Sequence, residues 1–124
     1  MNQPNKIPDG ELEVMMAVWQ AGESATSDTI MEYLAGRKKW GRTTVLKFLS
    51  RLCDRGYLQQ EKHGKLNVYF PLVKQQDYLE MESKSFLERL CQNSVKKLVA
   101  SLYDGKAISK EDLEELKKFI EEAE

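Results

Sequence analysis

The chain has 124 residues, enough for one compact domain with a modest appendage but too few for two large domains. Hydrophobic residues make up 41% and charged residues 31%, the balance of a globular protein, and no apolar run approaches the roughly 18 residues of a membrane span. Residues 1–6 lack the apolar core of a signal peptide, so we expect a cytoplasmic protein without membrane insertion.

The net charge of −1 conceals an uneven distribution along the chain. Residues 37–65 hold nine lysines and arginines against two acidic residues, whereas the segments on either side are net acidic. A basic block of this kind indicates a local anionic partner, and the alternative is a solvated charged surface.

The two cysteines, Cys53 and Cys91, lie far apart and form no C-x-x-C pair. Their number and spacing favour neither a disulfide framework nor a zinc site, so each is interpreted as a small, at least partly buried apolar residue. We therefore predict that the protein holds no metal and no cofactor.

Helical periodicity predicts three helices in the first half of the chain, over residues 10–20, 27–35 and 42–55. Ser24 or Thr26 is the expected cap of the second helix. The apolar stripes of the first and third helices fall at positions i, i+3, i+4 and i+7, and they consist of Leu12, Met15, Met16 and Trp19 in the first and Val45, Phe48, Leu49 and Leu52 in the third.

The second half of the chain begins with a change from helical spacing to alternation. Residues 57–62 and 66–70 are predicted to pair as a β-hairpin with Gly64 in its turn. From residue 76 the period is helical again, and it predicts one long helix over 76–102 and a last helix over 110–122. The boundary between domains is placed after residue 73, which gives domains over 1–73 and 74–124.

Three helices followed by a hairpin is the order of a winged helix-turn-helix domain. The predicted fold is therefore mainly α-helical, with a small β-hairpin wing and a C-terminal two-helix dimerisation domain. The polar face of the third helix suits the major groove of double-stranded DNA, where Thr43, Thr44, Lys47 and Arg51 are predicted to read base edges. The predicted contacts to the DNA backbone are Lys38, Lys39, Arg42, Lys62, His63 and Lys65.

His63 and the nearby aromatic residue Trp40 each have two interpretations. His63 is either a DNA contact at the tip of the wing or a solvated turn residue. Trp40 either stacks on the DNA backbone or packs under the third helix.

The C-terminal helices are amphipathic, and their leucines need a partner surface to cover them. We predict a homodimer, because a palindromic DNA site requires a two-fold protein, and the alternative is that these helices fold back on the first domain. The predicted dimer contacts are Phe86, Leu87, Leu90, Val95, Leu98, Val99, Leu102, Leu113, Leu116 and Ile120.

Several segments resemble the penicillinase-repressor family in the order in which that family has them. Residues 40–52, W-G-R-T-T-V-L-K-F-L-S-R-L, are similar to its recognition-helix region, and residues 12–19 are similar to its first helix. The segments K-H-G-K at 62–65 and Y-F-P-L-V at 69–73 are similar to the wing of that family and to the segment by which its chain leaves the wing. The dimerisation segments around 82–87 and 94–99 and the last helix at 109–116 also match.

This resemblance implies a dimeric bacterial repressor on a dyad operator, relieved by a signal that acts on the C-terminal domain. In the β-lactam branch a membrane sensor-protease pathway leads to cleavage of the repressor at an Asn-Phe bond. Ser101 and Leu102 stand at that position here, so the sequence departs from the pattern at the possible cleavage site. The C-terminal C-x-C motifs of the copper branch are absent from the sequence.

A protein-interaction module and an enzyme are the two alternatives to a DNA-binding function. A winged helix also serves as a protein-interaction module without specific DNA binding, and this is the alternative function. An enzyme is not expected, because the sequence pairs no nucleophile with a base and has no metal cluster or phosphate-binding loop.

Overall fold

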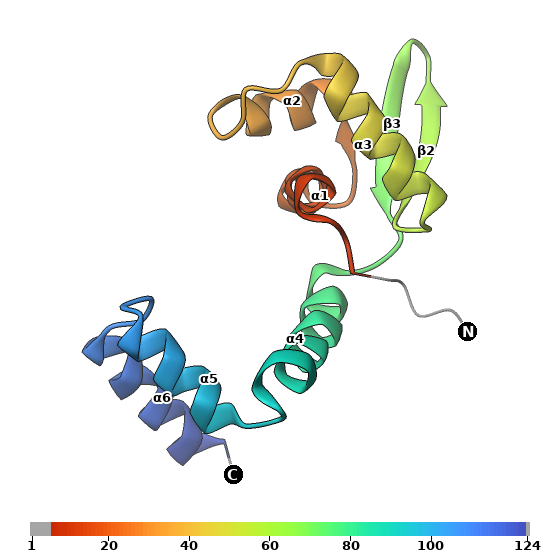
Figure 1. Ribbon diagram of the computed structural model, residues 1–124. Helices are drawn as coiled ribbons and strands as arrows, with labels where there is room; N and C mark the ends of the chain where they lie inside the picture. Colours follow the sequence, from red (N-terminus) through yellow and green to blue (C-terminus); the bar gives the residue numbers. More distant parts are fainter. Residues whose placement is uncertain (1–5, 124) are drawn as a thin grey trace. The chain divides into compact units, whose positions relative to one another are not determined.

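The computed structural model describes residues 6–123 and divides the chain into two compact units, Met1–Leu79 and Glu80–Glu124 (Figure 1). The division falls inside a helix, somewhat beyond the boundary expected from the sequence. Most of the segment examined for a signal peptide, residues 1–5, lies outside the described residues. Within the described residues, no helix combines the length and the apolar character that crossing a bilayer requires.

The first unit contains three helices and a small sheet, which confirms the predicted winged-helix order. Its elements are α1 (Asp9–Ala21), β1 (Ala25–Thr26), α2 (Ser27–Ala35), α3 (Arg42–Asp54), β2 (Leu58–His63) and β3 (Leu66–Pro71). The sheet is antiparallel in the order β1-β3-β2, and α3 contacts β2 (Figure 1). The two-residue strand β1 was not predicted, because it exists only through its pairing with β3.

Local capping explains where several of these elements begin and turn. The side chain of Thr26 accepts a hydrogen bond of 3.1 Å from the amide of Thr29 and so caps α2. Thr26 is one of the two residues that the sequence predicted as this cap. In the hairpin His63 pairs with Leu66, and Gly64 takes a φ of 66° that a side chain would disfavour. The wing is thus a tight hairpin whose turn is Gly64 and Lys65.

The buried face of α1 differs from the expected stripe. Val14, Met15 and Val18 are buried, together with Ala17, whereas Leu12, Met16 and Trp19 are only half-buried. The reason is that α1 contacts α2, α3 and β3 at once, so its buried face is broad and does not follow one stripe. The expected stripe of α3 is closer to the structure, with Val45, Leu49 and Leu52 buried and Phe48 half-buried.

A cluster of aromatic rings holds the first turn of the next helix, α4 (Gln75–Cys91), on the first unit. The ring of Tyr78 lies 5.8 Å from that of Trp19 and 5.9 Å from that of Tyr57. The hydroxyl of Tyr78 accepts a hydrogen bond of 2.9 Å from the amide of Ile7, and the indole of Trp19 donates one of 2.9 Å to the carbonyl of Val73. These contacts explain why the division between the units falls inside α4.

The second unit consists of the rest of α4, α5 (Val95–Asp104) and α6 (Lys110–Glu122). The single helix predicted over residues 76–102 is wrong, since the chain leaves the helix after Cys91. Gln92 and Asn93 have φ values of 52° and 64°, and the amide of Asn93 donates to the carbonyl of Leu87. Ser94 then caps α5 by accepting a hydrogen bond from the amide of Lys97. The C-terminal region therefore contains three helical segments.

The last helix follows the sequence prediction closely. Ser109 accepts from the amide of Asp112, and the carboxylate of Asp112 accepts from the amide of Ser109, which completes a capping box. Neither α5 nor α6 contains a buried residue. Cys91 in α4 is the one buried apolar residue of the second unit among the described residues.

Candidate nucleic-acid interface

Helix α3 has one face in the core and one in solvent. Thr43, Lys47 and Arg51 are exposed, and Thr44 is half-buried at the edge of that face. The buried residues on the opposite side fix the helix on α1 and on the sheet. Three of the four residues predicted to read bases therefore lie on an accessible, rigidly held surface.

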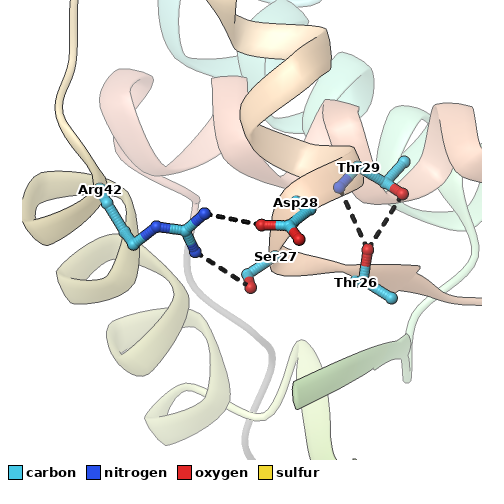
Figure 2. A network of polar contacts seen from close by, with 5 residues as sticks. All are labelled: Thr26, Ser27, Asp28, Thr29 and Arg42. Atoms are coloured by element: carbon cyan, nitrogen blue, oxygen red, sulfur yellow. Dashed lines mark hydrogen bonds and ion pairs between the residues drawn. The ribbon is translucent and has the colours of Figure 1, made fainter. Parts of the chain in front are cut away.

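The N-terminus of α3 is tied to the N-terminus of α2 through Arg42 (Figure 2). One guanidinium nitrogen of Arg42 lies 2.6 Å from Oδ1 of Asp28, and the other donates to the hydroxyl of Ser27 at 3.3 Å. Both charged side chains are exposed. Arg42 is a predicted phosphate contact, but in this structure its positive charge already pairs with the carboxylate of Asp28. The sequence did not predict this ion pair.

Aromatic rings position the basic turn that precedes α3. The guanidinium of Arg37 lies 4.5 Å from the ring centre of Tyr33, and the ammonium of Lys38 lies 5.6 Å from that of Trp40. Trp40 in turn meets Phe48 of α3 edge-on at 5.1 Å. Of the two interpretations of Trp40, the structure therefore favours packing against the third helix, while Lys38 and Lys39 remain exposed.

The close packing behind this turn also depends on a glycine. A Cβ atom at Gly10 of α1 would lie only 3.0 Å from the ring of Phe48. The small residue lets α1 approach the ring that supports Trp40.

The wing carries Lys62, His63 and Lys65, all exposed. Nε2 of His63 lies 3.0 Å from Oε1 of Glu61, and the amide of Gln59 donates to the other oxygen of that carboxylate at 3.1 Å. Residues two apart on a strand share a face, which is how His63 and Glu61 meet. His63 therefore has an acidic neighbour, Glu61, and the sequence did not predict this pairing.

The cysteines have the character that the sequence predicts. Cys91 is buried and Cys53 is half-buried, and both are free thiols. Burial, and secondarily the carboxylate of Asp54, raises the pKa of the Cys53 thiol. Burial also raises the pKa of Tyr69, with Cys53 as the second cause. Across residues 6–123, no three histidine, cysteine or acidic side chains group as they would around a metal ion.

The second unit presents apolar side chains to solvent on all three of its helices. Of the predicted dimer contacts, Phe86, Leu90, Val95, Leu102 and Ile120 are exposed, and Leu87, Leu98, Val99, Leu113 and Leu116 are half-buried. A groove of about 450 Å³ lies among them, lined in part by Phe86, Leu90, Leu98 and Leu102. The prediction omitted Phe119, which is 67% exposed and continues the apolar stripe of α6.

Residues 7–122 match the sequence profile of the family described as penicillinase repressor. The chain is 33% identical to a penicillinase repressor from Bacillus licheniformis over 98% of its own length and 94% of that protein. It is 26% identical to the methicillin resistance regulatory protein MecI of Staphylococcus aureus strain N315, over 96% of each chain.

Two solved structures resemble the N-terminal part of the chain. One is the DNA-binding domain of the repressor BlaI, with a TM-score of 0.54 and 32% identity, covering 63% of this chain and 94% of that one. The other is the monomeric form of Bacillus licheniformis BlaI in complex with the blaP half-operator, with a TM-score of 0.53, 31% identity and the same coverage. With its winged-helix fold and a match over nearly its whole length, the chain belongs to the penicillinase repressor family.

Proposed function

We propose that this protein is a dimeric transcriptional repressor that binds a palindromic operator in double-stranded DNA. The observation that carries the proposal is the solvent-facing polar surface of α3, held on a buried core within a domain similar to that of BlaI in complex with a half-operator. An exposed helix with cationic and hydroxyl side chains has the shape and chemistry to enter a major groove.

In this proposal Thr43, Lys47 and Arg51 read base edges, and Thr44 contributes from the edge of the face. The backbone contacts come from the basic turn, from Arg42 and from the wing residues Lys62, His63 and Lys65. Arg42 reaches a phosphate by exchanging its contact with Asp28, because the ion pair is exposed and an exposed pair is weak. Since the target is an operator in bacterial DNA, the protein acts in the cytoplasm.

The apolar surface of the second unit supports the dimer. Side chains such as Leu90, Phe119 and Ile120 are exposed in the single chain, and large apolar residues exposed on each of its three helices favour a partner that covers them. A second copy of the chain is its partner in the proposal, because a two-fold operator requires two recognition helices.

We place the off-switch in the same unit. A signal that opens the dimer also separates the two recognition helices, which lowers operator affinity without touching α3. Ser101 and Leu102, at the position of cleavage in the β-lactam branch, are both exposed on α5. The proposal includes proteolysis there, downstream of a membrane sensor-protease, as one form of the signal.

The test uses the full chain and a duplex that it selects from a random pool. Fluorescence anisotropy across a salt series measures binding to this duplex and to a scrambled control. We expect two chains per selected duplex, a dyad in its sequence, and an affinity that falls steeply with salt because phosphate contacts release counterions. Lys65→Ala should weaken binding to both duplexes equally and flatten the salt slope by about one unit per protomer.

The contrary outcomes are distinct. Equal, weak binding to every duplex would reduce the function to general DNA binding. A failure to bind DNA at low salt would replace the proposal with the protein-interaction module. An unchanged salt slope in Lys65→Ala would remove the wing from the interface.

A further inference from the structure

Leu46 is an apolar residue on the solvent-facing side of α3. It is 37% exposed, whereas Val45, Leu49 and Leu52 of the same helix are at most 1% exposed. No other large apolar side chain of α3 is as exposed. Leu46 was not among the predicted site residues, because it belongs neither to the apolar stripe nor to the basic set.

The neighbours of Leu46 on the helix surface are polar. Arg42 lies one turn before it and Ser50 one turn after it, at the four-residue spacing of side chains that adjoin on one face. Thr43, one turn before it at three-residue spacing, is exposed too. Because buried Leu49 stands three residues after it, Leu46 lies at the border between the buried face of α3 and the exposed surface that the proposed function places in the major groove.

Only one base offers an apolar group at the major-groove edge. Thymine carries a 5-methyl group there, while the other edges present hydrogen-bond donors and acceptors that leucine cannot satisfy. A leucine pressed against those polar edges would remove water without replacing its hydrogen bonds, and this costs free energy. The same side chain against a methyl group removes apolar surface from water, which is favourable.

We propose that Leu46 is a specificity-determining residue that contacts the 5-methyl group of a thymine in each half-site. This inference rests on the proposed function, because it requires α3 to lie in the major groove. It adds to the polar readout an apolar contact that selects thymine at one position.

The experiment removes the methyl group alone. In the duplex that the full chain selects, each thymidine is replaced in turn by deoxyuridine, which keeps base pairing and lacks only the 5-methyl group. At one position in each half-site, this substitution should weaken binding of the wild-type chain. The expected loss is about fourfold for each methyl group removed, because burying one methyl group stabilises a complex by about that factor. Leu46→Ala should bind the original duplex more weakly and show no further loss on deoxyuridine substitution at that position.

Leu66→Ala is the matched control, since Leu66 is an exposed leucine on the wing and off the recognition helix. It should retain the wild-type sensitivity to deoxyuridine. Equal sensitivity in wild type and Leu46→Ala would overturn the inference and assign the methyl contact to another side chain. The inference is also overturned if no thymidine is sensitive while the chain still binds its duplex, and in that case the proposed repressor function stands. If the full chain selects no duplex, both fail.

Discussion

The two units of this protein differ in how much of their apolar surface they bury within one chain. In the first unit, side chains from all three helices and the sheet are buried, among them Val14, Leu34, Leu49 and Tyr69. In the second, α5 and α6 have no buried residue, and Ile120 is 61% exposed. The first unit therefore builds a core within one chain, whereas the second leaves apolar side chains in solvent for the proposed dimer to cover.

The contrast follows from the number of layers that each unit can assemble. The first unit packs helices on helices and on a sheet, so a central element such as α1 is covered from several sides. The second has only the end of α4 and the two short helices α5 and α6, too few to enclose a core.

The largest effect is expected from a charge in the exposed stripe of α6. Ile120→Glu should raise the dissociation constant of the dimer at least about 100-fold, because burying an unpaired carboxylate costs several kcal/mol. Sedimentation equilibrium measures the change. The melting of the first unit should stay the same, since Ile120 belongs to the other unit.

Lys118→Glu is the control, because it places the same charge on α6 at an exposed polar position. It should leave the dimer intact. A wild-type chain that sediments as a monomer, or an Ile120→Glu variant that still dimerises, would contradict the idea that the second unit is half of an interface.

The next effect concerns an ion pair inside the first unit. Glu11 is 3% exposed, and its carboxylate accepts a hydrogen bond of 2.9 Å from Nε of Arg55. Arg55→Ala should lower the free energy of unfolding by about 2 kcal/mol, because it leaves a buried carboxylate without its partner, while the partial exposure of Arg55 limits the loss. Urea denaturation measures this.

A double variant controls for the loss of packing by Arg55. Glu11→Gln in the Arg55→Ala background should restore part of the stability, since a neutral amide is less costly to bury than an unpaired charge. The unfolding midpoint of the first unit should not depend on protein concentration. A midpoint that rose with concentration would mean that this unit also needs the partner chain.

Arg51→Ala should separate DNA recognition from dimerisation. Arg51 is exposed on α3, and its loss should weaken binding to the selected duplex by about 1–3 kcal/mol if it reads a base. Anisotropy on selected and scrambled duplexes measures the effect, and sedimentation should show an unchanged dimer. An equal loss on both duplexes would make Arg51 a phosphate contact.

The smallest effect is expected from freeing Arg42. Asp28→Asn removes the carboxylate that Arg42 must leave to reach a phosphate, so binding to both duplexes should tighten by less than about 1 kcal/mol, the worth of an exposed ion pair. Anisotropy measures the change, and Glu32→Gln, which removes an exposed charge of α2 outside this pair, should alter binding less. Weaker binding by Asp28→Asn would instead mean that Asp28 holds Arg42 in position for DNA.

The order and type of most elements could be predicted from local sequence patterns. Periodicity and capping are local properties, so the bounds of α2 and α6 could be predicted from residues such as Thr26 and Ser109. The same local reasoning failed at Gln92 and Asn93, where a helical apolar pattern continued across a break. The asparagine and the following serine were the signals that would have revealed that break.

Which charged and apolar side chains are accessible depends instead on how the elements pack together. Arg42 and Arg55 look alike in the sequence, yet one pairs with Asp28 at the surface and the other with buried Glu11. Leu46 and Leu49 lie three residues apart, and one is exposed while the other is buried. These outcomes depend on partners distant in the chain, because burial and ion pairing are set by which elements pack together, and no local window of sequence contains that information.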